Sequence, residues 1–102
     1  IFDEVDAGIG GAVAESVGKQ LRQLGAHRQV LCVTHLGQVA ACGQQHFVVS
    51  KAVREGQTYT SVTPIDGKSR VGELARMIGG KTTTAATEAM ARELLKSARD
   101  AE

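Results

Sequence analysis

Two short apolar segments flank one amphipathic segment in the first third of the chain, and this arrangement limits the folds open to it. Residues 1–3 and 30–33 are predicted to be buried strands, the second covered on both faces. Residues 11–24 are predicted to form a helix with a buried stripe of Val13, Val17, Leu21 and Leu24. Such a unit implies a parallel strand pair with a right-handed crossover. The sequence therefore predicts an α/β fold, in which functional groups gather at the carboxyl ends of the strands.

The rest of the chain continues the mixed pattern. The predicted elements are a short helix over 36–41, a β-hairpin of strands 47–53 and 58–65, a helix over 71–78 and a last helix. Thr82, Thr83 or Thr84 can cap the last helix, and its buried face is predicted to carry Met90, Leu94 and Ala98. The polar residues from Ser97 onward are expected to fray. The predicted order is β-α-β-α-β-β-α-α.

Composition excludes several classes of protein. A chain of 102 residues forms one domain or less, and none of its apolar runs approaches the ~20 residues of a membrane helix. Two cysteines are too few for a secreted disulfide scaffold. Three aromatic residues argue against a stacking platform for single strands. A net charge of +1 means that any DNA surface must be a local patch or lie elsewhere in a parent protein.

Polar side chains follow both predicted parallel strands. Asp3 and Glu4 end the first strand, and His35 follows the second. Asp3 can hold Mg²⁺ directly or through water, Glu4 can act as the general base for an attacking water, and His35 can donate a hydrogen bond to developing charge on a phosphate. A turn carboxylate with a solvated neighbour and a structural histidine are the alternatives. The grouping of all three, followed by glycines, favours a nucleotide site.

Three glycine motifs resemble phosphate-binding loops without matching them. Residues 8–13 resemble a dinucleotide fingerprint, but Val13 stands where the last glycine belongs. Gly67-Lys68-Ser69 and Gly80-Lys81-Thr82 end like a P-loop, but Val62 and Ala75 occupy the positions of its first glycine. We interpret the two P-loop-like motifs as turn and cap residues.

Two other groups of residues have structural interpretations. Cys32 with His35 and Cys42 with His46 have spacings that could suggest zinc, but buried thiols fit the apolar context better. Five basic residues group loosely, and a solvated face is favoured over a DNA contact: Lys51, Arg54, Lys68, Arg70 and Arg76.

Four segments resemble the RecN family of bacterial DNA repair proteins. Residues 1–11 resemble the Walker B segment and following loop of that family, and residues 33–40 its switch-histidine segment. Residues 47–51 and 73–80 are similar to its carboxyl-terminal region. The resemblance covers nearly the whole chain, with the four segments in the right order. It implies the carboxyl-terminal lobe of a P-loop ATPase head like those of ABC-type and chromosome-maintenance (SMC) proteins.

The resemblance also implies roles and partners. Asp3 takes the Walker B magnesium role, Glu4 the base role and His35 the switch role, with ATP and Mg²⁺ as cofactors. The loop that would touch a second, identical head is Asp6, Ala7, Gly8, Ile9 and Gly10. Many ABC-type heads end this loop in an aspartate where this chain has Gly10, so no role is assigned to the acid of the loop.

Residues 1–102 as a whole are expected to be the carboxyl-terminal part of the head, incomplete and inactive without an amino-terminal lobe that carries the P-loop. The implied parent protein has a long coiled coil and contacts DNA but no membrane. It works in recombination and double-strand-break repair in the bacterial cytoplasm, associated with the nucleoid. Two alternatives remain: a non-catalytic interaction lobe, or a head fragment of another SMC or ABC-type ATPase.

Overall fold

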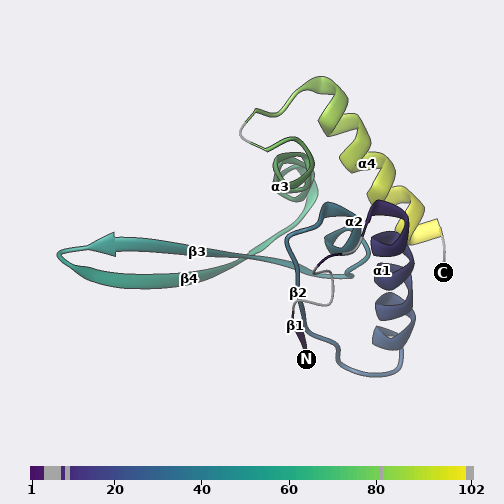
Figure 1. The fold of residues 1–102 in the computed structure, drawn as a ribbon, viewed down its shortest axis with the longest axis horizontal. Helices are drawn as coiled ribbons and strands as arrows, with labels where there is room; N and C mark the ends of the chain where they lie inside the picture. The colour runs from purple at the N-terminus through teal and green to yellow at the C-terminus, as the bar shows by residue number, and fades with distance from the viewer. Residues whose placement is uncertain (4–7, 9, 81, 101–102) are drawn as a thin grey trace.

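The chain forms a mixed α/β fold with helices on one side and a long hairpin on the other (Figure 1). The computed structural model describes residues 1–3, 8, 10–80 and 82–100. The elements are β1 (Phe2–Asp3), α1 (Gly11–Gly25), β2 (Cys32–Val33), α2 (Gly37–Ala40), β3 (His46–Arg54), β4 (Gln57–Ile65), α3 (Gly67–Gly79) and α4 (Ala85–Asp100). The order predicted from the sequence is confirmed.

Strands β1 and β2 form a small parallel sheet connected through α1. Phe2 pairs with Cys32 and Asp3 with Val33, as the strand–helix–strand pattern predicts. Leu31 and Val33 are each 54% exposed, so the expectation of a strand covered on both faces is wrong here. The physical reason is that Leu31 and Val33 share one face of the strand, and the described elements do not cover that face.

Helix α1 packs on α2 through small residues rather than through the predicted stripe. Its buried residues are Ala14 and Gly18, whereas Val13 and Leu24 are exposed. A Cβ placed on Gly18 would lie 2.8 Å from the Sγ of Cys42, a separation that side chains do not tolerate. The close approach of the two helices therefore requires glycine at this position and directs the larger apolar residues to the side.

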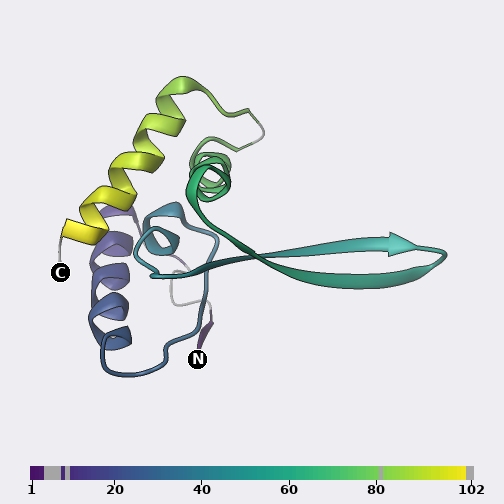
Figure 2. The same ribbon diagram turned by 180° about the vertical axis from the view of Figure 1, so that it is seen from behind.

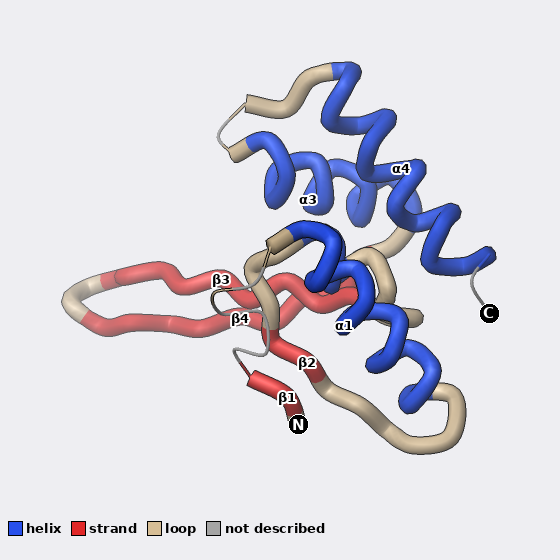
Figure 3. The backbone as a smooth tube through the Cα atoms, turned by 45° about the vertical axis from the view of Figure 1, so that its right-hand side comes forward, coloured by secondary structure: helices blue, strands red, loops and turns tan. Residues whose placement is uncertain are grey.

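The main core lies between α2, α3 and α4. Figure 3 shows α3 and α4 above the parallel strands. Its buried members are Ala41, Leu74, Ala75 and Ala91. Leu74 is the one large side chain among the described residues that is fully buried. Small alanines around one leucine let three helices approach closely, and the position of α2 is fixed as a result.

Helix α4 begins at a reciprocal threonine cap. The Thr87 N–H donates to Thr84 Oγ1 at 3.2 Å, and the Thr84 N–H donates to Thr87 Oγ1 at 2.8 Å, so Thr84 is the cap among the three candidates. Met90 is 55% exposed, so its predicted place in the buried face is wrong; Ala91 occupies that place. Residues 97–100 of the tail are helical, with Ala98 buried, which corrects the expectation of fraying for them; residues 101–102 lie outside the described residues.

Strands β3 and β4 form an antiparallel hairpin that extends away from the helices, as both opposite views show (Figures 1 and 2). Its turn is Glu55-Gly56, with φ of 51° and 77°, the positive values that a tight two-residue hairpin turn uses. The predicted hairpin is confirmed with slightly longer strands. Pro64 lies one residue from the end of β4, where a missing N–H is tolerated. Nearly all of the hairpin's residues are exposed on both faces.

Candidate functional site

The carboxyl ends of β1 and β2 lie at the same edge of the parallel sheet. Asp3, the last residue of β1, pairs with Val33, the last residue of β2, and the Phe2 N–H donates to the Leu31 carbonyl oxygen at 2.7 Å. Adjacent strands lie about 4.8 Å apart. The exposed carboxylate of Asp3 and the turn that follows β2 are therefore neighbours, as the sequence predicts. Glu4, the predicted base, lies outside the described residues.

The turn that carries His35 is held at both sides. The Leu36 N–H donates to Thr34 Oγ1 at 3.0 Å, which bends the chain from β2 into α2. Gly37 is buried against α3, and a Cβ there would lie 3.1 Å from Cγ1 of Ile78. Helix α2 thus starts at a fixed point on α3. His35 is exposed between these two anchors, just after the carboxyl end of β2.

Two glycines, Gly8 and Gly10, lie between β1 and α1. Gly8 has a φ of +74°, which disfavours any other residue, and Gly10 precedes α1 in extended conformation. No described heavy atom lies within 4 Å of a Cβ built at either glycine. This backbone is therefore accessible to an approaching group. Asp6, Ala7 and Ile9 of the predicted interface loop lie outside the described residues.

The cysteines lie in apolar surroundings. Cys42 is buried, its Sγ donates to the Gln38 carbonyl oxygen at 3.4 Å, and burial raises the pKa of its thiol, while the charge of Arg22 opposes this. Cys32 is half-buried. Over residues 1–3, 8, 10–80 and 82–100, no three His, Cys, Asp or Glu side chains gather as a metal site. A magnesium site at Asp3 remains a prediction from the sequence.

The two P-loop-like motifs border α3. Gly67-Lys68-Ser69 forms its first turn, with Asp66 as N-cap and a φ of +51° at Gly67. Gly80, with a φ of +77°, ends the same helix. Both glycines thus have the turn and cap roles that we expected, and Lys81 lies outside the described residues.

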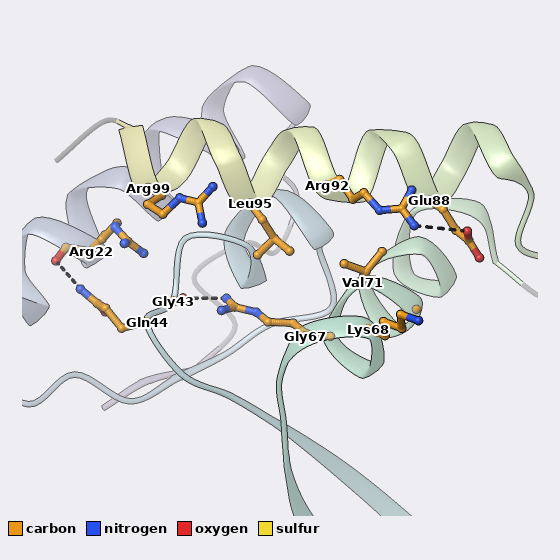
Figure 4. A pocket seen from close by; sticks show the side chains of 12 residues that line it. Arg22, Gly43, Gln44, Gly67, Lys68, Val71, Glu88, Arg92, Leu95 and Arg99 are labelled. Atoms are coloured by element: carbon orange, nitrogen blue, oxygen red, sulfur yellow. Dashed lines mark hydrogen bonds and ion pairs between the residues drawn. The ribbon is translucent and has the colours of Figure 1, made fainter.

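The five basic residues grouped by sequence do not share one surface. Lys51 and Arg54 lie on the hairpin, Arg76 pairs with Glu73 on α3, and the Arg70 guanidinium points inward to carbonyl oxygens that end α2. A basic cleft of about 870 Å³ is lined by two of the five, Lys68 and Arg70, together with Arg22, Arg92 and Arg99 (Figure 4). The seven-residue spacing of Arg92 and Arg99, two turns on one helix face, was the signal in the sequence that we missed.

Known proteins match the chain over almost its whole length. It is 52% identical over 98 residues to the DNA repair protein RecN of Vibrio cholerae, 53% over 95 residues to that of Deinococcus radiodurans and 43% over 98 residues to that of Bacillus subtilis. These alignments cover 93–96% of the chain but only 17–18% of the relatives. No protein-family model matches. No helix in the described part of the chain is long and apolar enough to cross a membrane. Over the segment that it shares with these relatives, the chain belongs to the RecN family.

Proposed function

We propose that this chain supplies the magnesium, base and switch-histidine half of an ATPase site within a DNA repair protein. The observation that carries the proposal is the parallel pairing of β1 and β2, with Asp3 at one strand end and the Thr34–His35 turn beside it. Phosphoryl transfer to water needs this set of groups at one edge: a metal-side carboxylate, a residue that orients water and a donor to the phosphate oxygens.

Each residue has a distinct role in this proposal. The exposed Asp3 carboxylate offers oxygen ligands of the kind Mg²⁺ prefers, directly or through water. Mg²⁺ would offset negative charge on the phosphate oxygens of ATP. Glu4, one residue beyond, accepts the proton of the attacking water. The imidazole of His35 donates a hydrogen bond to the terminal phosphate, and its turn is prepositioned by Thr34 and Gly37.

The proposal includes a larger assembly. We assign this chain to the carboxyl-terminal lobe of a P-loop ATPase head of the ABC and SMC type, completed by an amino-terminal lobe of the same head that brings the phosphate-binding loop. A second head would contact the loop from Asp6 to Gly10, and the open backbone at Gly8 and Gly10 leaves room for it. ATP-dependent pairing of heads would then serve DNA double-strand-break repair and recombination through a DNA-bound parent protein, near the nucleoid in the bacterial cytoplasm.

The test is ATP hydrolysis by the full-length protein carrying Glu4→Gln. Turnover should fall by at least 100-fold, a loss in the range expected for a residue that transfers the proton. ATP binding should persist because Glu4 is not proposed to hold the nucleotide. Asp3→Asn should instead raise the Mg²⁺ concentration needed for half-maximal activity. Glu15→Gln, which removes an exposed carboxylate paired with Lys19 on α1, is the matched control.

The alternative is a lobe whose site is inactive and whose role is to bind other parts of the repair machinery. Exposed apolar surface often marks a protein-binding site. The exposed face of the β1–β2 sheet, with Leu31 and Val33, therefore supports this interaction lobe as the second candidate. Wild-type turnover in both Glu4→Gln and His35→Ala would refute the ATPase roles assigned above and leave this alternative. A residual rate below 1% of the parent in Glu4→Gln would exclude it.

A further inference from the structure

A cleft between α1, α3 and α4 gathers a large share of the chain's positive charge. Its lining includes five basic side chains, contributed by three helices, and one acidic side chain: Arg22, Lys68, Arg70, Arg92, Arg99 and Glu88. The whole chain has twelve basic and eleven acidic residues, so its charge is nearly balanced. An excess of four positive charges in one cleft is therefore a local feature of the fold, and local cation clusters attract anions.

Two of the arginines form the floor of the cleft. Arg70 Nη2 donates to the carbonyl oxygens of Gly43 at 2.6 Å and Ala40 at 3.1 Å, and Arg22 Nη1 donates to the Cys42 carbonyl oxygen at 2.8 Å. These bonds secure the segment after α2. Burial lowers the pKa of Arg70, and the positive charge of Arg22 lowers it further. The two guanidinium groups thus act on each other as like charges, a situation that a bound anion relieves.

Three cations line the walls and are open to a ligand. Arg92 and Arg99 are exposed on α4, with Leu95 between them, and Lys68 is exposed at the start of α3 (Figure 4). The ion pair of Arg92 with Glu88 spans 3.8 Å between exposed side chains, so it holds Arg92 weakly. Arg92 and Arg99 are two helical turns apart, about 10 Å along the axis. An elongated polyanion fits this spread of charge better than a single phosphate group.

We propose that this cleft binds the phosphodiester backbone of duplex DNA. Its lining, as the structure describes it, contains no aromatic side chain to stack on a base, and its apolar part is Val71 and Leu95. Contacts would therefore go to phosphates and carry no sequence preference. The site goes beyond the proposed ATPase function, because its lining residues are separate from Asp3, Glu4 and His35.

The test is the affinity of the full-length protein for a fluorescent 30-base-pair duplex of random sequence, measured by anisotropy at several salt concentrations. The logarithm of the association constant falls as the logarithm of salt concentration rises. Loss of two phosphate contacts makes this negative slope shallower by about 1.8, which corresponds to roughly 30-fold weaker binding at 150 mM salt. We expect this result for Arg92→Gln/Arg99→Gln. Lys68→Gln on α3 should weaken binding about fivefold by the same relation.

The matched control is Arg28→Gln/Lys96→Gln, which removes the same charge from exposed residues outside the cleft, one of them on α4. It should leave the salt slope unchanged. ATP affinity should stay unchanged in every variant, which separates this proposal from the ATPase proposal. An unaltered slope in both cleft variants would overturn the inference, as would an equal loss in the control. A lowered melting temperature with unchanged DNA affinity would also overturn it, because the cleft would then hold an acidic segment of the protein.

Discussion

The helical half of the molecule and the β1–β2 sheet differ in how far they cover their own apolar side chains. Leu74 and Ala75 of α3 have no exposed surface, whereas Leu31 and Val33 beside and within β2 are each 54% exposed. Apolar burial is the main stabilising contribution to a fold. The stability of this chain therefore resides in the helices, and the candidate ATPase residues lie on the half that contributes less to it.

The largest expected effect is the difference in unfolding free energy between two leucine-to-alanine substitutions, one in each half of the molecule. Leu74→Ala should lower the free energy of unfolding by about 2–5 kcal/mol, because it opens a cavity among three helices. Leu31→Ala removes a side chain that is already half in water, and should cost less than about 1 kcal/mol. Urea denaturation of both variants measures the difference. Equal losses would show that the two halves are stabilised alike.

The sequence predicted the elements well and the buried faces less well. The two parallel strands were located from short apolar segments, the helices from apolar periodicity, and the hairpin from two β-prone segments separated by a turn. The buried face of α1 was assigned to Val13, Val17, Leu21 and Leu24 because large residues dominate hydrophobic patterns; Val17 and Leu21 are half-buried, whereas Val13 and Leu24 are exposed. The buried face is Ala14 and Gly18, and only the distance between α1 and α2 reveals that glycine is required there.

The functional residues, like the fold, were predictable from the sequence only in part. The shared edge of Asp3 and the His35 turn followed from the strand–helix–strand pattern, because a right-handed crossover leaves few other arrangements. The basic cleft could be predicted only in part, from the seven-residue spacing of Arg92 and Arg99 on one helix face. Arg22, Lys68 and Arg99 are far apart in the sequence, and they meet because α1, α3 and α4 pack around the segment that Arg70 secures. Tertiary contacts of this kind leave no local pattern.

A second, smaller effect concerns the packing of α1 on α2. Gly18→Ala places a methyl group 2.8 Å from Cys42 Sγ and should cost about 1–3 kcal/mol in the free energy of unfolding. Gly72→Ala on α3 makes the same change where no atom lies within 4 Å, and should stabilise the helix by about 0.5–1 kcal/mol. Thermal and urea unfolding of the two variants should therefore shift in opposite directions.

The double variant Gly18→Ala/Cys42→Ala checks the cause of that loss. Removing Sγ takes away the closest atom, so part of the lost stability should return, although the Cβ of residue 42 would still lie 3.2 Å from the new methyl group. Additive losses in the double variant would mean that the contact with Cys42 is not what makes glycine necessary.

The smallest expected effect lies where the helical half meets the hairpin, at His46, the first residue of β3. Its Nδ1 is buried without a hydrogen-bond partner among the described residues. Burial lowers the pKa of His46, and the charge of Arg70 lowers it further, while Glu73 opposes both. Since the unfolded chain binds a proton near pH 6.5 and the folded chain only at lower pH, stability should fall as the pH drops through about 6.5. His46→Gln should flatten the dependence of urea midpoint on pH between 5 and 7, with His27→Gln as the matched substitution of an exposed imidazole. A pH dependence unchanged by His46→Gln would mean that the hairpin base opens to water, and that the packed half of the molecule ends before residue 46.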